Sequence, residues 1–208
     1  MKKFLLVDDH KVVRSGISGL LSTMYIPCEV DEASDGNMAL EKLKEQEYDL
    51  IMMDVQIPNN DMLGIMEYIH TKYPKAKVLI FSMSSENIYA KRFLKAGARG
   101  FLSKDSQLDE ITKAINLVLS DRKYISEALA ETLADGLTSG KSDNPFHNLS
   151  LREFEITSLL LSGQTLSDIS KSLNLQPSTV GTHKARAFDK LKVTNLLELK
   201  DLATSYNL

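Results

Sequence analysis

Cysteine is almost absent from this sequence of 208 residues, in which Cys28 is the only one. A single cysteine cannot form a disulfide within the chain, which excludes the disulfide-stapled class of secreted proteins and fits a reducing compartment. Long apolar runs are also lacking, since none approaches the roughly 20 residues that a membrane-spanning helix requires. The apolar stretch Phe4–Val7 near the N-terminus is short and ends in two aspartates, so we expect no secretory signal peptide. These absences predict a cytoplasmic protein that does not associate with a membrane.

The composition is otherwise that of a folded protein. Hydrophobic residues make up 43% and charged residues 25% of the chain, both ordinary values for globular domains. The net charge of -3 is unevenly distributed: residues 148–208 contain seven basic and six acidic residues, whereas the preceding residues have an excess of four acidic residues. Four of those seven basic residues fall between Lys184 and Lys192. A chain of this length is comfortable for two domains, and the charge asymmetry suggests that they have different functions.

Residues 3–120 alternate between short apolar runs and amphipathic segments, a pattern that predicts βαβ units and a parallel sheet. The expected strands are Lys3–Val7, Glu29–Ala33, Leu50–Asp54, Lys77–Ser82 and Arg99–Ser103. The expected helices are Val12–Thr23, Gly36–Glu45, Met62–Tyr73, Glu86–Ala96 and Gln107–Ser120. Gly97 directly follows the fourth helix, as a C-terminal cap would. The sequence therefore predicts an α/β domain with a five-stranded, doubly wound parallel sheet.

The next segment differs in composition and is expected to connect two domains. Ser126–Leu137 has the apolar spacing of a weak helix, and Thr138–Asn148 collects Gly, Ser, Asp and Asn around Pro145. Such a composition is typical of a linker. We therefore expect one domain over residues 1–121, a connecting segment with a short helix over 122–147, and a second domain over 148–208.

The second domain is expected to be all helical. Ser150–Glu153 is an S-x-x-E capping box that opens a helix running to about Leu161, where Gly163 follows. A short helix over Leu166–Leu173 ends before Asn174, and Pro177 opens a longer helix that carries the basic cluster to about Leu191. A last helix spans about Leu196–Thr204. A short helix, a tight turn and a basic second helix are typical of a helix-turn-helix.

Acidic residues stand at two of the points where an apolar run of the first domain stops. Asp8 and Asp9 follow the first strand, and Asp54 ends the third. The carboxyl ends of parallel strands lie side by side, at the edge where open α/β sheets bind ligands. Three carboxylates there cannot all stay ionised without a counter-cation. A divalent metal site thus competes with the interpretation that these are unrelated turn and cap residues.

Ser82 and Lys104 weigh in favour of a site, because they end the fourth strand and follow the fifth. Each residue alone is more often a turn, cap or surface residue, but all of them at strand ends of one sheet is an improbable coincidence. Mg²⁺ binds oxygen ligands, usually one or two carboxylates with water and phosphate. A carboxylate beside it can attack a phosphoryl group and form an aspartyl-phosphate, whose oxygens an ammonium and a hydroxyl would bind.

With these residues in place, residues 1–120 resemble a response-regulator receiver domain, and the whole chain resembles the NarL/FixJ family. The resemblance implies that Asp54 accepts the phosphoryl group and that Asp8 and Asp9 bind Mg²⁺ together with Asp54 and the backbone carbonyl of Gln56. It assigns Ser82 and Phe101 to the switch and makes Lys104 the family's phosphate-binding lysine. Further matches to the family loop are Pro58 and Gly64. The phosphodonor that it implies is a sensor histidine kinase.

Two features depart from the family pattern. The segment Asn59–Leu63 between Pro58 and Gly64 is about two residues longer than usual, and Met83 is bulkier than the small residue often found after the switch hydroxyl. Both flank the phosphoacceptor, so we expect them to affect access of the phosphodonor. Neither removes a charged group.

The segment from Leu149 to Ile156 and its continuation resemble a LuxR-type DNA-binding domain, over essentially all of residues 148–204. A helix that begins at Pro177 presents free N–H groups at Ser178 and Thr179, which favour a phosphate. Thr182 could contact a base edge or a thymine methyl group. The residues expected to contact DNA are Ser178, Thr179, Gly181, Thr182, His183, Lys184, Arg186 and Lys190, of which the basic ones position the protein on phosphates without reading sequence.

The hypothesis that follows is a transcription regulator, not an enzyme, in which phosphorylation of Asp54 changes homodimerisation and binding to promoter DNA. An alternative is a receiver-based protein-interaction module whose second domain has lost specific DNA binding. It is motivated by Gly181, which stands where the family commonly has a lysine. A third possibility, a metal-dependent phosphohydrolase on the same carboxylates, lacks a second general acid beside Asp54.

Overall fold

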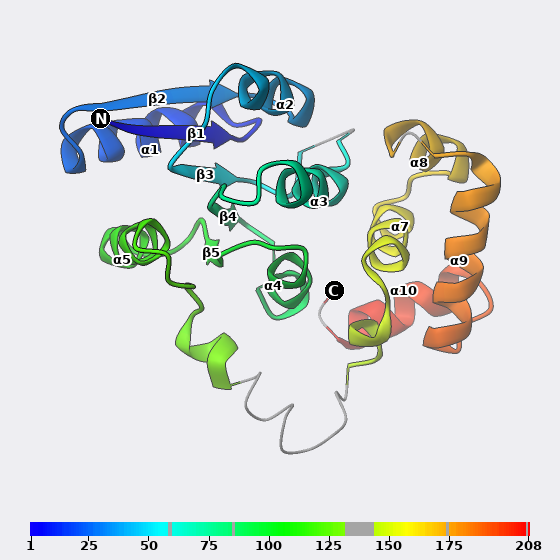
Figure 1. Ribbon diagram of the computed structural model, residues 1–208. Helices are drawn as coiled ribbons and strands as arrows, with labels where there is room; N and C mark the ends of the chain where they lie inside the picture. The colour runs from blue at the N-terminus through cyan, green and yellow to red at the C-terminus, as the bar shows by residue number, and fades with distance from the viewer. Residues whose placement is uncertain (58–59, 85, 132–143, 174, 207) are drawn as a thin grey trace. The chain divides into compact units, whose positions relative to one another are not determined.

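The computed structural model describes residues 1–57, 60–84, 86–131, 144–173, 175–206 and 208. The chain divides into two compact units, Met1–Leu133 and Ala134–Leu208 (Figure 1), and each is described by itself. Several sequence predictions lie wholly or partly outside the described residues. They are Pro58, the start of the Asn59–Leu63 loop, the helix beyond residue 131, the linker over 138–143, and the helix end at Asn174.

The first unit is built on a five-stranded parallel sheet with the order β2-β1-β3-β4-β5. Its strands are β1 (Lys2–Val7), β2 (Cys28–Ala33), β3 (Leu50–Met53), β4 (Val78–Ser82) and β5 (Gly100–Ser103). Its helices are α1 (Lys11–Met24), α2 (Gly36–Glu45), α3 (Met62–Lys72), α4 (Glu86–Lys95) and α5 (Leu108–Leu119). The predicted α/β doubly wound fold is confirmed.

Helices cover both faces of this sheet, which explains why its central strands are apolar at nearly every position. One face packs on α1 and α5 through a core that includes Phe4, Leu21, Leu102 and Ile115. The labels in Figure 1 show α2, α3 and α4 on the other side of the sheet. Because helices cover both faces, the edges of the sheet are the places open to polar side chains of the strands. The candidate functional residues lie at the carboxyl edge.

Backbone hydrogen bonds extend the strand pairing just past this edge. Asp54 N donates to Val7 O at 2.8 Å, and Lys104 N donates to Ser82 O at 3.1 Å. These bonds hold the first residue after each strand in line with its neighbour. Side chains from β1, β3, β4 and β5 therefore start from adjacent backbone positions.

The chain after α5, residues 122–131, packs back onto the same unit, and we call these residues the connector. Tyr124 forms a parallel bridge with Gly100, and its N–H donates to Arg99 O at 2.9 Å. Gly100 is required for this contact, because a Cβ there would lie 2.8 Å from Tyr124 O. Tyr124 and Leu129 are both buried, and a helix occupies residues 127–131.

In the described part of the second unit, all regular elements are helices. They are the 3₁₀ helix η1 (Pro145–Asn148), α7 (Leu151–Leu161), α8 (Leu166–Ser172), α9 (Pro177–Leu191) and α10 (Leu196–Ser205). The capping box of Ser150 and Glu153 is confirmed, and Thr165 and Asp168 form a second one at the start of α8. Gly163 ends α7 with a φ of 89°, a conformation that favours glycine. The predicted helix-turn-helix is thus present as α8 and α9.

One difference from the sequence prediction lies at residues 145–148. Their linker-like composition placed most of them in the connecting segment, but they form η1, with Phe146 fully buried and its ring centroid 6.3 Å from that of Tyr206. A single 3₁₀ turn is too short to show a helical period in sequence. Among the described residues, none of the helices is long and apolar enough to cross a membrane.

Candidate functional site

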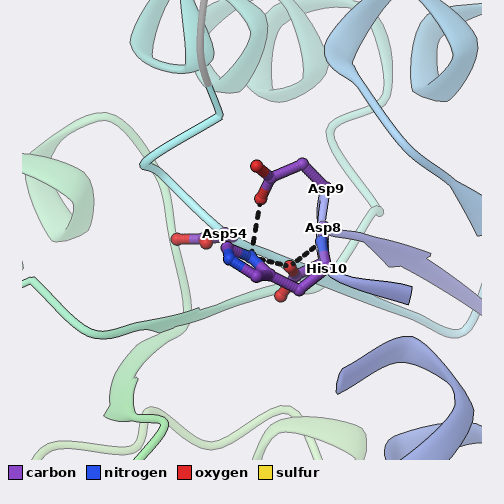
Figure 2. Close-up of side chains that lie close together, drawn as sticks. All are labelled: Asp8, Asp9, His10 and Asp54. Carbon is purple, nitrogen blue, oxygen red and sulfur yellow. Dashed lines mark hydrogen bonds and ion pairs between the residues drawn. The ribbon is translucent and has the colours of Figure 1, made fainter. Parts of the chain in front are cut away.

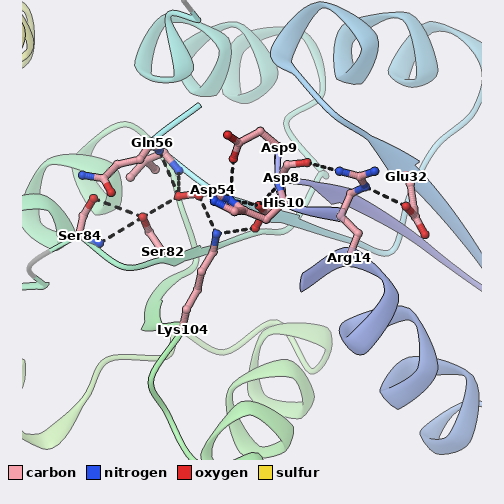
Figure 3. Close-up of polar contacts among 11 residues, drawn as sticks. Asp8, Asp9, His10, Arg14, Glu32, Asp54, Gln56, Ser82, Ser84 and Lys104 are labelled. Atoms are coloured by element: carbon pink, nitrogen blue, oxygen red, sulfur yellow. Dashed lines mark hydrogen bonds and ion pairs between the residues drawn. The ribbon is translucent and has the colours of Figure 1, made fainter. Parts of the chain in front are cut away.

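Three charged side chains meet at the carboxyl edge of the sheet. Lys104 Nζ lies 2.6 Å from Asp8 Oδ2 and 2.7 Å from Asp54 Oδ2 (Figure 3). All three side chains are less than a tenth exposed, at 8%, 7% and 3%. Lys104 is therefore the cation that lets two buried carboxylates lie close together.

The electrostatics of Lys104 follow from this position. Burial alone lowers the pKa of the Lys104 ammonium, but its hydrogen bonds to Asp54 and Asp8 outweigh burial and raise the pKa above the usual value. The group is consequently held in its charged form at neutral pH. One positive charge against two carboxylates leaves the site with a net negative charge.

The second oxygen of Asp54 is fixed by three donors. Ser82 Oγ donates to Asp54 Oδ1 at 2.6 Å, and the backbone N–H groups of Val55 and Gln56 lie 2.6 and 3.1 Å from the same oxygen. Ser82 itself contacts Ser84, with 3.2 Å between the two hydroxyl oxygens. Both oxygens of Asp54 are thus oriented by named donors, and the carboxylate is held in one position.

Asp9 and His10 extend the cluster toward solvent. His10 Nδ1 lies 2.8 Å from Asp9 Oδ1 and 3.2 Å from Asp8 Oδ1, and Figure 2 shows the imidazole lying beside the carboxylates. One ligand atom from each of Asp8, Asp9, His10 and Asp54 lies within 4.8 Å of the others. The oxygen-rich donor set and its excess negative charge fit a hard divalent cation such as Mg²⁺.

The structure brings together Asp8, Asp54, Ser82 and Lys104 as the sequence predicted, with Asp9 at the rim. Gln56 contributes a backbone N–H to Asp54. Phe101 is fully buried in β5, where it is paired with Ile80 of β4. Met83 is 57% exposed.

Sequence reasoning missed three neighbours of this cluster. His10 directly follows the acidic pair, and Ser84 stands two residues after Ser82. This closeness in sequence to predicted site residues was the signal that could have identified them. Arg14 donates from its guanidinium to Asp8 O at 2.6 Å and to Glu32 Oε2 at 2.8 Å. It lies in the first turn of α1, where a basic residue has no distinguishing pattern. These contacts fix the backbone from which Asp8 projects.

The residues expected to contact DNA lie on α9, the second helix of the helix-turn-helix. Ser178, Thr182 and Arg186 are exposed, whereas Thr179, Gly181, His183 and Lys184 are partly buried. Val180, Ala187, Phe188 and Leu191 form the buried side of α9. One side of the helix thus packs in the domain, and the other is available to a ligand.

Two of the predicted phosphate partners have contacts inside the domain. Lys190 Nζ lies 2.6 Å from Glu153 Oε2, whose side chain is 5% exposed, and Lys184 Nζ lies 5.1 Å from the centre of the Phe188 ring. Burial alone raises the pKa of Glu153, but the hydrogen bonds from Lys190 and Ser150 outweigh it and lower that pKa. Glu153 and Lys190 therefore connect the first turn of α7 to the last turn of α9, which orients α9.

Gly181 is the residue of α9 that departs from the resemblance. A Cβ added there would meet nothing within 4 Å, so the backbone does not require glycine. We expect Gly181→Ala to raise the free energy of unfolding by about 0.5–1 kcal/mol, because alanine is the better helix former. Chemical denaturation of the full chain measures the change.

Gly163 provides the matched control. A Cβ at Gly163 also meets nothing within 4 Å, but its φ is +89°, so Gly163→Ala should destabilise the protein by about 1 kcal/mol or more. If both substitutions change the free energy of unfolding in the same direction, steric space and backbone conformation do not explain the presence of these two glycines.

Comparison with known protein families assigns both units. The sequence model described as "Response regulator receiver domain" matches residues 4–116, and that described as "Bacterial regulatory proteins, luxR family" matches residues 147–203. The chain therefore belongs to the response regulators that join a receiver domain to a LuxR-type helix-turn-helix, the NarL/FixJ type. It is a DNA-binding response regulator of a two-component system.

Particular relatives agree with this assignment. The chain is 34% identical over 208 residues to "Response regulator GacA" of Pseudomonas protegens, covering 100% of this chain and 98% of the relative. It is 34% identical over 209 residues to "Response regulator UvrY" of Escherichia coli K12, covering 100% and 96%. These relatives are named as regulators and not as enzymes, and the match over residues 147–203 supports DNA binding rather than the interaction-module alternative.

A solved structure shares the fold along the whole chain. RcsB from Salmonella enterica serovar Typhimurium, bound to promoter rprA in the presence of the phosphomimetic BeF₃⁻, has a TM-score of 0.77 at 22% identity and covers 98% of both chains. At this identity the likeness shows the fold alone.

Proposed function

We propose that Asp54 accepts a phosphoryl group from a sensor histidine kinase and that its phosphorylation controls binding of residues 148–208 to promoter DNA. The observation that carries this proposal is the placement of Asp54: it is 3% exposed, with Lys104 on one oxygen and Ser82 on the other. In this proposal residues 1–121 are the receiver, residues 122–147 connect, and the protein acts in the cytoplasm.

Mg²⁺ would be held by Asp8, Asp9, Asp54 and the backbone carbonyl of Gln56, where it would neutralise the carboxylates as the phosphoryl group approaches. A carboxylate oxygen of Asp54 attacks phosphorus in line with the P–N bond of the phosphohistidine. The P–O bond forms as the P–N bond breaks, and the departing imidazole takes the electron pair and later a proton. The fixed orientation of Asp54 lowers the entropic cost of this attack.

Lys104 and Ser82 then bind the product. Their donors now point at Asp54, and an aspartyl-phosphate presents further oxygens beyond the carboxylate to the same ammonium and hydroxyl. Because a phosphate adds about two negative charges, both side chains should follow it. A displacement of Ser82 at the end of β4 alters the surface near α4 and β5, which changes homodimerisation and DNA binding.

The reaction is stoichiometric: each Asp54 stores one phosphoryl group, and the protein turns over no small substrate. The experiment is to incubate the full chain with acetyl phosphate in the presence of Mg²⁺ and, separately, of EDTA. After borohydride reduction of the acyl phosphate, peptide mass spectrometry should locate the modification at Asp54, in the Mg²⁺ sample only. Modification at another aspartate, or equal modification in EDTA, would contradict the proposal.

A further inference from the structure

Two glutamates hold the connector on the first unit in the same manner. Ser126 Oγ donates to Glu86 Oε2 at 2.6 Å, and Tyr124 OH donates to Glu110 Oε1 at 2.8 Å. Glu86 is in the first turn of α4, and Glu110 is in the first turn of α5. The connector is therefore attached by two hydroxyl-to-carboxylate bonds, one to each helix.

The two attachments differ in how they relate to Asp54. Ser84, two residues before Glu86, has its hydroxyl 3.2 Å from that of Ser82, which donates to Asp54. Glu86 thus follows, two residues along the chain, a serine whose hydroxyl contacts Ser82, the partner of Asp54. Glu110, in contrast, contacts Tyr124 and Lys113, neither of which touches Asp54, Ser82 or Ser84 in any contact between described residues.

The two glutamates also differ in how fully their carboxylate oxygens are hydrogen-bonded. Glu86 Oε1 is buried and has no hydrogen-bond partner among the described residues, and a buried unsatisfied oxygen carries a desolvation cost. A small shift of α4 that exposes Glu86 to water removes this cost. This cost offsets part of the stabilisation that the Glu86–Ser126 bond provides.

Ser126 is placed so that its bond to α4 affects the connector helix. Its hydroxyl oxygen accepts from Leu129 N at 3.0 Å, and Ala130 N donates to Ser126 O at 3.0 Å. Ser126 is thus the N-cap of the helix at residues 127–131, and the same hydroxyl donates to Glu86. Loss of the Glu86 bond frees the cap residue and allows the first turn of this helix to fray.

We propose that Glu86 is a positioning residue that reports the state of Asp54 to the connector through its hydrogen bond with Ser126. A phosphoryl group on Asp54 draws the Ser82 hydroxyl toward it, Ser84 and the first turn of α4 move with it, and the Glu86–Ser126 bond breaks. Tyr124 stays on Glu110 and keeps the connector attached. This inference rests on the proposed phosphorylation of Asp54 and adds the route by which it leaves the receiver.

Hydrogen–deuterium exchange of the full chain, with and without Mg²⁺ and BeF₃⁻, tests the route. In the unsubstituted protein, BeF₃⁻ should speed exchange of the amides of residues 127–131 by about five-fold, the size expected when one capping contact is lost. Glu86→Ala should show the faster exchange already without BeF₃⁻, and BeF₃⁻ should add little. Glu110→Ala is the matched control: it should loosen the bridge at Tyr124 yet keep the BeF₃⁻ response of residues 127–131.

Fluorine NMR of bound BeF₃⁻ in each variant separates the possible failures. If BeF₃⁻ binds and residues 127–131 do not respond, or if Glu86→Ala responds as the unsubstituted protein does, the route through Glu86 is wrong while the proposed function stands. If Glu110→Ala loses the response and Glu86→Ala keeps it, the route runs through α5 instead. Failure of BeF₃⁻ to bind the unsubstituted protein would overturn the proposed function together with this inference.

Discussion

Asp54→Asn should abolish the response of the protein to phosphodonors. The substitution keeps the size of the side chain but replaces the nucleophilic carboxylate oxygen by an amide that cannot form an acyl phosphate. We expect labelling by acetyl phosphate to fall below detection, and the difference in DNA affinity between donor-treated and untreated protein to disappear. Labelling is measured by intact-protein mass spectrometry, and affinity by titration onto promoter DNA at several salt concentrations.

Asp105→Asn is the matched control for this result. Asp105 is exposed and follows Lys104 directly, so its substitution makes the same change in charge near the site without touching Asp54. It should leave both labelling and donor-dependent DNA binding unchanged. Donor-dependent dimerisation or DNA binding that persists in Asp54→Asn would show that control by phosphorylation of Asp54 is wrong.

Lys104→Met should make the stability of the protein depend on divalent cations. Removing the ammonium leaves Asp8 and Asp54 buried without their cation, and breaking a buried ion pair in this way costs on the order of 3 kcal/mol. We expect the free energy of unfolding in EDTA to fall by about this amount and Mg²⁺ to restore most of it, since the ion binds the folded state. Urea denaturation with EDTA and with Mg²⁺ measures both quantities.

Two further variants define the cause of this loss. In the Lys104→Met/Asp54→Asn double variant only one of the two carboxylates is left without its cation, so part of the lost stability in EDTA should be regained. Lys113→Met removes a lysine that is 62% exposed and paired with Glu110, and it should change stability by less than about 0.5 kcal/mol. A Lys104→Met variant as stable in EDTA as the parent would mean that the carboxylates do not need Lys104.

The sheet and the cluster of side chains around Asp54 could be predicted because both follow from positions in the sequence. Apolar runs that end in Asp8, Asp54, Ser82 and Lys104 belong to parallel strands, and parallel strands bring their carboxyl ends together. No knowledge of side-chain contacts is needed for that step. Helix starts could be predicted from local signals, because Ser150 is a capping residue and Pro177 favours the first turn of a helix. Tertiary packing did not override these signals.

Contacts between distant side chains could not be predicted in this way. Lys190 and Glu153 are 37 residues apart, and nothing in either helix indicates that the lysine pairs with a buried glutamate. The attachment of the connector could not be predicted either, because Tyr124 and Ser126 form hydrogen bonds to Glu110 and Glu86, which lie on other elements. Polar residues in a segment of linker composition have no period that shows where they attach.

The close fit of Tyr124 against Gly100 bears on where the two domains can be exchanged between proteins. The connector packs against Gly100 so closely that there is no room for a methyl group. A chimera cut directly after α5 would replace the connector by a foreign segment at this contact. An alanine in place of Gly100 would clash with the backbone of Tyr124 and disturb this junction. The transferable unit thus includes Tyr124 and Leu129, which are both buried, in addition to the sheet and the helices α1 to α5.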